Sequence, residues 1–155
     1  MTDDKIESGA ELLLWRHADA EDGIPDAGRA LTKKGLKQAA HVAQWLKPRL
    51  PRGCLILVSP AKRAQQTAAA LDLPYTDEER VGTRANVADM VAASGWPSRK
   101  GAVLVVGHQP TLGRLAASLL AGEQADWTIK KGALWWFSRR AGEVVLRAVV
   151  SPDLL

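Results

Sequence analysis

The stretch Leu12–Asp19, LLLWRHAD, joins a continuous apolar run to an abrupt polar turn. An unbroken apolar run of this length is typical of a strand that is buried on both faces, as in a parallel sheet covered by helices. The polar residues then fall where the strand emerges at the carboxyl edge of the sheet, and open α/β sheets place their ligand crevices at that edge. The guanidinium group of Arg16 would supply positive charge and paired N–H donors there, and His17 would supply a nucleophile.

Two later apolar runs, Leu55–Val58 and Val103–Val106, have the same buried-strand character and also end at polar turns. The first run ends at Ser59, which we expect to cap a helix that has Pro60 at its first position. The second run ends close to His108. Because right-handed crossovers join parallel strands, we expect all three strand ends to lie on one edge of the sheet.

Arg63 falls in the first turn of the helix expected to reach about Leu71, near the positive end of that helix. Together with Arg16, His17 and His108 it predicts a pocket with two guanidinium groups, two imidazoles and no carboxylate from those turns. So much positive charge in one pocket is costly unless an anion neutralises it. A guanidinium fork matches the oxygens of phosphate, so the sequence predicts a phosphate site.

The rest of the chain alternates strands with helices, which predicts a three-layer α/β/α fold around a mostly parallel sheet. The last two expected strands are joined by a turn at Ala141-Gly142, so at least one strand runs antiparallel. The remaining expected elements are helices over 33–46, with Thr32 as the N-cap, over about 87–93 and over 111–120, strands over 134–138 and 144–150, and a polar loop over 74–80.

A chain of 155 residues with 46% hydrophobic and 25% charged residues is typical of one globular domain, which we expect over residues 11–155 after a flexible segment 1–10. No apolar run approaches the roughly 20 residues that cross a bilayer, and residues 1–10 lack the features of a signal peptide. Cys54 is the only cysteine. We therefore expect a cytoplasmic protein without membrane partner or disulfide, in which Cys54 packs in the core.

The formal net charge of +4 is modest, and the Lys and Arg residues are scattered rather than gathered in one run. This pattern argues against nucleic acid as a partner, while a mild positive field attracts phosphorylated partners. No feature predicts an oligomer, so a monomer is expected.

Four motifs in order resemble those of the histidine phosphatase superfamily, also called phosphoglycerate mutase-like. They are Arg16-His17-Ala18, LTKKGLKQA over 31–39, SPAKRAQQTA over 59–68 and VGH over 106–108. Their order, their spacing and the chain length are most similar to the small bacterial branch of SixA-type phosphohistidine phosphatases. The resemblance covers about residues 11–155. The first motif usually has glycine after the histidine, and Ala18 keeps that position small.

The resemblance implies phosphoryl transfer through a covalent phosphohistidine, with neither a metal ion nor an organic cofactor. By position, His17 is the nucleophile, while Arg16, Arg63 and His108 hold the phosphoryl oxygens, with Ser59 as a further phosphate-binding residue. The substrate implied is a phosphohistidine-bearing protein, such as a phosphotransfer domain in signal transduction. Inorganic phosphate is the product.

A proton donor for the leaving group is harder to assign. Larger members of the family use a Glu or Asp after the second helix, and here Glu78 and Glu79 are candidates without a matching motif, with Asp19 as a third. A phosphorylated imidazole leaves as neutral imidazole, whose conjugate acid has a pKa of about 6.5, and so needs less help than an alcohol. The short segment between Leu73 and Val103 also leaves no room for a capping subdomain, which suits phosphate carried on a folded protein.

Two alternatives stay open at this point. One is a broad-specificity phosphomonoesterase of the same superfamily with Glu78 or Glu79 as its acid. The other is a non-catalytic phosphoprotein-binding module, which Ala18 and the missing acid permit.

Overall fold

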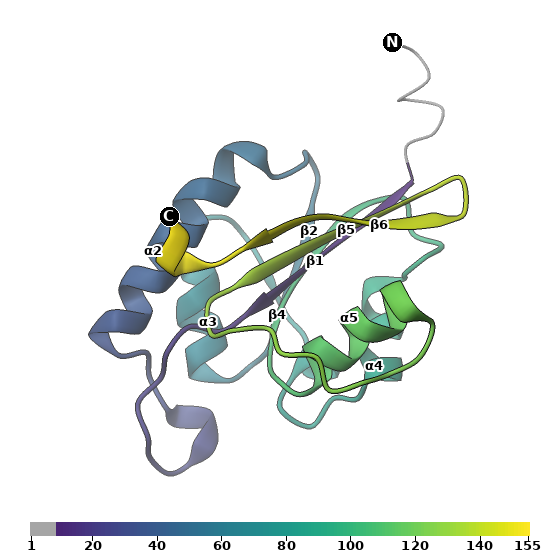
Figure 1. The fold of residues 1–155 in the computed structure, drawn as a ribbon. Coiled ribbons are helices and arrows are strands. Elements are labelled where there is room, and N and C mark those ends of the chain that lie inside the picture. Colours follow the sequence, from purple (N-terminus) through teal and green to yellow (C-terminus); the bar gives the residue numbers. More distant parts are fainter. Residues whose placement is uncertain (1–8) are drawn as a thin grey trace.

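The structure, a computed structural model, describes residues 9–155, and its strands form one six-stranded sheet (Figure 1). The strands are β1 (Ala10–Arg16), β2 (Leu55–Val58), β3 (Thr76–Asp77), β4 (Gly101–Gly107), β5 (Leu134–Arg140) and β6 (Glu143–Val150). The helices are α2 (Lys33–Leu46), α3 (Lys62–Ala69), α4 (Val87–Ser94) and α5 (Thr111–Ala121), with short 3-10 turns η1 (Asp26–Gly28), η2 (Lys47–Arg49), η3 (Glu79–Val81) and η4 (Pro152–Leu154).

The strand order is β3-β2-β4-β1-β5-β6, in which β3, β2, β4 and β1 run parallel to one another. Strand β5 runs antiparallel to β1, and β6 runs antiparallel to β5. Helices α2 and α3 pack on one face of the sheet, and α4 and α5 pack on the other. The predicted three-layer α/β/α fold with a mostly parallel sheet is confirmed.

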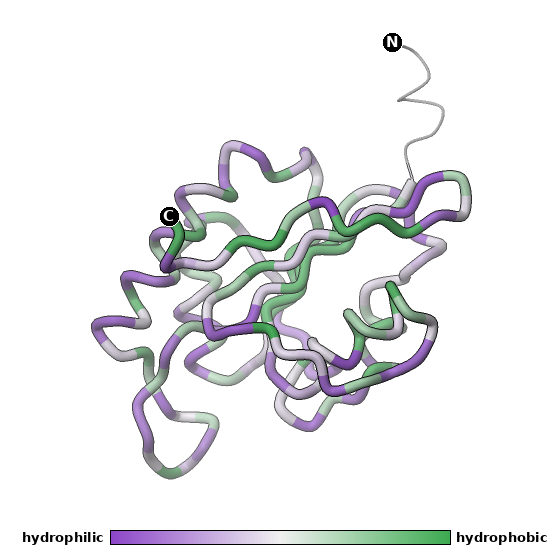
Figure 2. Tube along the Cα trace, in the orientation of Figure 1, coloured by the Kyte–Doolittle hydropathy of each residue, from purple (hydrophilic) through white to green (hydrophobic). Residues whose placement is uncertain are grey.

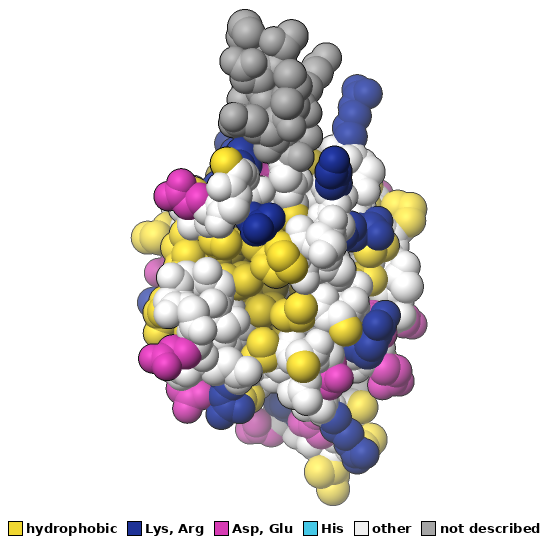
Figure 3. All heavy atoms as spheres, turned by 90° about the vertical axis from the view of Figure 1, so that its right-hand side faces the viewer, with side chains coloured by type: hydrophobic (Ala, Val, Ile, Leu, Met, Phe, Trp, Pro, Cys, Tyr) yellow, Lys and Arg dark blue, Asp and Glu magenta, His cyan; other side chains and the backbone are white. Residues whose placement is uncertain are grey.

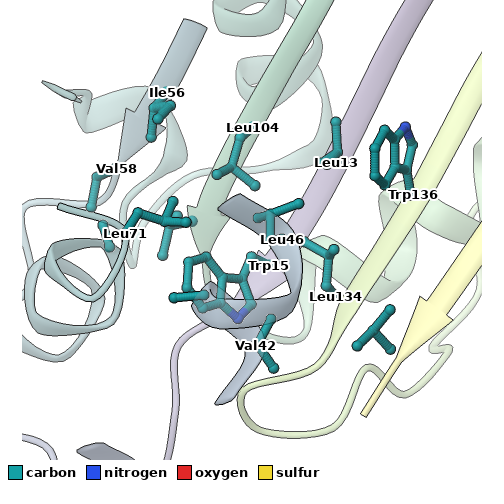
Figure 4. Packing of buried hydrophobic residues seen from close by; sticks show 14 of the residues in the cluster. Leu13, Trp15, Val42, Leu46, Ile56, Val58, Leu71, Leu104, Leu134 and Trp136 are labelled. Carbon is teal, nitrogen blue, oxygen red and sulfur yellow. The ribbon is translucent and has the colours of Figure 1, made fainter. Parts of the chain in front are cut away.

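The alternation of side chains along β1 divides the core into two halves. On one face, Leu13 and Trp15 are fully buried against Val42 and Leu46 of α2 (Figure 4). The Trp15 indole N–H donates to the Gly132 carbonyl oxygen at 2.9 Å, so this large side chain is buried with its polar atom satisfied. The strands stand out as the most hydrophobic part of the trace (Figure 2).

On the other face, Leu12 and Leu14 pack with Leu112 and Leu115 of α5. Trp135 of β5 lies at the margin of this second cluster and is only partly buried. Hydrophobic side chains accordingly gather on the side of the molecule that Figure 3 turns to the viewer.

Helix α2 begins where the sequence predicts, because the Thr32 hydroxyl accepts a hydrogen bond from the Gly35 N–H at 2.9 Å. The same hydroxyl lies 2.8 Å from the Asp19 carboxylate. A Cβ on Gly35 would lie 2.0 Å from the Asp19 carbonyl oxygen, so only glycine lets the segment after β1 pass this close to α2. These contacts fix the polar turn of β1 against the helix.

Helix α3 differs from its predicted bounds of 60–71, because it spans Lys62–Ala69 and has Ala61 rather than Ser59 at its N-cap. The Ser59 hydroxyl accepts from the Ala61 N–H at 3.2 Å, which closes a tight turn before the helix instead of capping it. Arg63 still lies in the first turn, as predicted.

The segment 74–80 was predicted to be a loop throughout, but it holds the short strand β3 and the start of η3. Strand β3 pairs with β2 through Leu57 and Thr76. Two exposed polar residues carry no periodic pattern, so the sequence offered no sign of this strand. The other predicted strands and helices form within two residues of their expected ends.

The flexible segment was expected to cover residues 1–10, but Ala10 already belongs to β1 and pairs with Arg139. Residues 1–8 lie outside the described residues, and the prediction for them stays a prediction. Cys54 packs half-buried against the first core cluster, and burial raises the pKa of its thiol to about 11. Within residues 9–155, no helix combines the length and apolar character that crossing a bilayer requires.

Candidate active site

The carboxyl ends of β1, β2 and β4 meet at one edge of the sheet, from which the segment after β1 projects at the bottom of Figure 1. The backbone N–H of His17 donates to the Gly107 carbonyl oxygen at 3.1 Å, and the backbone N–H of Ser59 donates to the Val106 carbonyl oxygen at 3.0 Å. These bonds bring the imidazoles of His17 and His108 together, with ring centroids 5.2 Å apart.

The His17 imidazole is held in one orientation. Its Nδ1 lies 2.8 Å from the Ala18 carbonyl oxygen, and because a carbonyl can only accept, Nδ1 carries the proton and Nε2 keeps its lone pair. His17 is 7% exposed, and burial lowers its pKa to about 4, with the charges of Arg63 and Arg16 acting in the same direction. The ring is therefore neutral at pH 7 and presents a free nucleophilic nitrogen.

The turn that carries His17 is tied to helix α3. The Ala18 N–H donates to the Thr67 hydroxyl at 3.1 Å, and that hydroxyl donates to the Arg63 carbonyl oxygen at 2.7 Å. Ala18 is fully buried, so a small residue is needed at this position. The turn of His17 and Arg63 thus share one rigid support.

His108 takes its orientation from Ser59. The Ser59 hydroxyl lies 2.7 Å from His108 Nε2. This hydroxyl also accepts from the Ala61 N–H, and we infer that it donates its own proton to Nε2, which leaves the ring proton on Nδ1. Burial lowers the pKa of His108 to about 3, helped by His17 and Arg63, so this ring is also neutral at pH 7. In the structure the Ser59 hydroxyl contacts this histidine, and its phosphate-binding role stays a prediction.

The two guanidinium groups are anchored by backbone oxygens. Arg16 donates to the Ile129 carbonyl oxygen at 3.0 Å, and partial burial lowers its pKa. Arg63 is 4% exposed and donates to the Asp26 carbonyl oxygen at 2.9 Å and to the Asp26 carboxylate at 3.1 Å. Each of these hydrogen bonds fixes the orientation of a guanidinium group and leaves other N–H donors of that group without a partner within residues 9–155.

Three buried nitrogens have no hydrogen-bond partner among the described residues: Nε of Arg16, Nε of Arg63 and Nδ1 of His108. All three are donors, and buried donors without partners are rare because each carries a desolvation cost. An oxyanion with several acceptor oxygens satisfies such a set at once. The charges of Arg16 and Arg63 act on the imidazoles of both His17 and His108, so the four residues predicted to hold phosphate or attack it lie near one another.

Asp26 was missed by the sequence reasoning, which placed it in a loop without a role. Its carboxylate reaches the Arg63 guanidinium, which holds the pKa of Asp26 below its usual range. The negative charge of Asp26 also acts to raise the pKa of His108. The spacing from Asp26 to Arg29, which form an ion pair at 3.0 Å, was the available sign of an ordered turn.

Two of the three predicted proton donors are engaged in other contacts. Glu78 caps η3 and pairs with Arg80 at 2.7 Å, and these contacts lower its pKa. Asp19 binds Thr32 and Lys131, which also lower its pKa, so both carboxylates stay ionised at pH 7. Glu79 is exposed.

Two surface grooves lie at the margin of the site. One, of about 380 Å³, is lined in part by Arg16 and runs between the start of α2 and the chain near Lys130. The other, of about 310 Å³, is lined in part by Ser59 and Glu79. Among residues 9–155, no three or more His, Cys, Asp or Glu side chains form a group suited to hold a metal ion.

Comparisons with known proteins show the family to which the chain is similar. Residues 12–85 match the model of the histidine phosphatase superfamily (branch 1). The phosphohistidine phosphatase SixA of Escherichia coli (strain K12) is 32% identical over 126 residues, which cover 73% of this chain and 76% of that protein. A SixA homolog of Haemophilus influenzae is 33% identical over 125 residues, covering 70% of this chain and 76% of that protein.

The solved structure of the protein histidine phosphatase SixA complexed with tungstate has the same fold. It matches with a TM-score of 0.76 at 26% identity, over 93% of this chain and 98% of that chain. The motifs, the sheet order and these relatives agree, and the chain therefore belongs to the histidine phosphatase superfamily, in its SixA-type branch.

Proposed function

We propose that this protein is a phosphohistidine phosphatase, which removes phosphate from a phosphorylated protein through a covalent intermediate on His17. One observation carries the proposal: a buried, neutral imidazole with a free Nε2 lies beside three buried donors that lack partners. The SixA structure that binds tungstate, itself a tetrahedral oxyanion, supports an oxyanion as the ligand.

In the first step, oxygens of the substrate phosphoryl group accept hydrogen bonds from Arg16, Arg63 and His108. His17 Nε2 attacks phosphorus, the bond from phosphorus to the substrate nitrogen breaks, and its electron pair stays on that nitrogen. The charge that spreads over the equatorial oxygens is stabilised by donors that are already in place.

In the second step, a water molecule attacks phosphorus and the bond to His17 Nε2 breaks. The electron pair returns to Nε2, one water proton is released to phosphate or solvent, and inorganic phosphate leaves. The hydrogen bond from Nδ1 to the Ala18 carbonyl keeps the ring in place through both steps.

The substrate class follows from the leaving group. Since Glu78 and Asp19 are held as carboxylates, neither is set to protonate an alcohol oxygen at pH 7. A phosphoimidazole that carries a proton on its distant nitrogen leaves as neutral imidazole and needs no enzyme acid. The grooves beside the site are open to solvent, which suits a phosphate carried on another protein.

The decisive experiment mixes the protein with a phosphohistidine protein and searches for acid-labile phosphate on His17. We expect it on the wild-type chain and not on His17→Ala, which should still bind inorganic phosphate. Without such phosphate on the wild-type chain, the anion site would belong to a binding module. For kcat/KM we expect phosphohistidine protein to exceed phosphoserine and sugar phosphates by at least about tenfold, because of its better leaving group.

A broad phosphomonoesterase is the second candidate, favoured by the position of Glu79 in the groove that also contains Ser59. In that case, replacing Glu78 and Glu79 together by glutamine should remove ester hydrolysis. An unchanged rate of ester hydrolysis in the double variant would eliminate this candidate.

A further inference from the structure

The two grooves at the margin of the candidate active site differ in charge. The groove at Ser59 contains one acidic and one basic side chain, Glu79 and Arg84. The groove at Arg16, here called the basic groove, is lined by the cationic side chains of Arg16, Lys34, Lys130 and Lys131 and by one carboxylate, Asp153. The positive charge around the site is therefore concentrated on one side.

The lysines of the basic groove are available to a partner. Lys34 and Lys130 are exposed, and neither forms an ion pair with another residue of the described part of the chain. Lys131 is paired with Asp19 at 3.0 Å, and Asp153 accepts a hydrogen bond from the Ser151 hydroxyl. The charges of Lys34 and Lys130 act on the carboxylates of Asp19 and Asp153, but together with Arg16 and Lys131 the cations of the groove outnumber these two carboxylates.

The position of Lys34 does not serve the stability of its helix. It lies in the first turn of α2, where the helix dipole favours negative charge, and that turn contains no acidic residue. Apart from its attraction to the Asp19 carboxylate, a lysine there gains little from the local fold. Lys34 instead lines the basic groove together with Arg16.

Arg16 lines the basic groove and belongs to the anion site through its buried Nε. A polypeptide that presents its phosphohistidine to His17 and leaves along this groove passes Lys34 and Lys130. We propose that the basic groove binds a glutamate- or aspartate-rich segment next to the phosphohistidine of the substrate protein. This inference rests on the proposed function, because it names the partner of the same site.

The test uses two phosphohistidine peptides, one with glutamates flanking the phosphohistidine and one with glutamines at the same positions. At low ionic strength we expect wild-type kcat/KM to favour the acidic peptide on the order of tenfold. The preference should shrink towards unity as salt screens the exposed charges. The variant Lys34→Glu/Lys130→Glu should lose or reverse the preference.

Lys47→Glu is the matched control, because Lys47 is exposed and follows the far end of the same helix α2. It should keep the wild-type preference. Thermal melting of all variants checks that each is folded. Equal rates for both peptides with the wild-type chain, or a preference that survives in the double variant, would overturn the docking proposal.

Failure of the proposed function has a different outcome. If the wild-type chain turns over neither peptide, the phosphatase proposal fails while the groove is still tested by binding. Fluorescence anisotropy of both labelled peptides with His17→Ala should then show tighter, salt-sensitive binding of the acidic peptide, which Lys34→Glu/Lys130→Glu abolishes. Equal binding of the two peptides contradicts the groove proposal alone.

Discussion

The floor and the rim of the active site are built differently. The floor consists of His17, Ser59, Arg63 and His108, each at most 7% exposed, held by three strand ends and one helix. The rim comprises exposed charges such as Asp26 on η1 and the lysines of the basic groove. In the floor, burial moves both histidine pKa values and leaves donors without partners, whereas charges in the rim are screened by water.

The difference shows where each property of the site originates. Donors that face an anion in a low-dielectric site are worth far more than the same donors in water, so under the proposed function the floor governs the chemistry. Exposed charge pairs contribute little individually but act over distance on an approaching partner, so the rim governs which substrates arrive. Substitutions in the two regions should therefore differ in size.

The largest effect is expected from Arg63→Ala, which removes a buried donor from the floor. We expect kcat/KM for a phosphohistidine peptide to fall about 10²- to 10³-fold, as for the loss of an oxyanion-hole donor. Arg29→Ala is the control, because Arg29 is also bound to Asp26 but lies nearer the surface. If both substitutions cost the same, the contrast between floor and rim is wrong.

The next largest effect concerns stability against pH. The folded pKa of His17 is about 4 and its unfolded value is about 6.5, so between these pH values the unfolded chain binds more protons. Stability is therefore lost as the pH falls through this range, by about 3 kcal/mol for His17 alone. His108 acts in the same direction.

Thermal melting from pH 7 to pH 4 measures this dependence. We expect the melting temperature of wild type to fall more steeply than that of His17→Asn, whose amide does not titrate. Inorganic phosphate should reduce the fall, because it stabilises the positive charge of the site. Parallel curves for the two proteins would show that His17 titrates normally in the fold.

Most of the floor could be predicted from the sequence. Apolar runs mark β1, β2 and β4, parallel topology places their ends together, and the motif residues at those ends are His17 and His108. The direction of each side chain could not be predicted, because it depends on contacts between distant positions. The bond between Ser59 and His108 joins residues 49 positions apart, and a serine before a proline resembles a helix cap just as well.

The rim was largely beyond prediction. Asp26 contacts Arg63 across 37 positions of sequence, and nothing in a Gly-, Pro- and Asp-rich loop specifies that contact. The basic groove forms because the start of α2 lies beside the residues that precede β5. Scattered lysines thus become one patch only in the folded chain, whereas the sequence favoured a dispersed surface charge.

The third prediction concerns Ser59→Ala. We expect kcat/KM to fall about tenfold, because one net hydrogen bond of about 1.4 kcal/mol is lost. Without the hydroxyl, His108 Nε2 loses its partner and the Nδ1 proton is no longer enforced. Nitrogen chemical shifts of His108 should change from one tautomer to a mixture. Ser94→Ala, another buried serine outside the site, is the control and should leave tautomer and activity unchanged.

The smallest effect is expected at the rim, from Asp26→Asn. The substitution keeps an oxygen that Arg63 can donate to but removes the negative charge that competes with phosphate for this guanidinium. Because the Asp26 side chain is 61% exposed, the pair is worth at most about 1 kcal/mol. Inorganic phosphate should therefore inhibit the variant with a Ki about two- to fivefold lower than that of wild type.

Asp126→Asn tests whether this gain is local, because Asp126 forms an exposed ion pair with Arg114 and contacts none of the floor residues. Its Ki should equal that of wild type. A large fall in kcat for Asp26→Asn, with Ki unchanged, would mean that this carboxylate handles a proton during turnover. Asp26 would then belong with the floor despite its exposure, and exposure would no longer separate residues that do chemistry from residues that admit substrate.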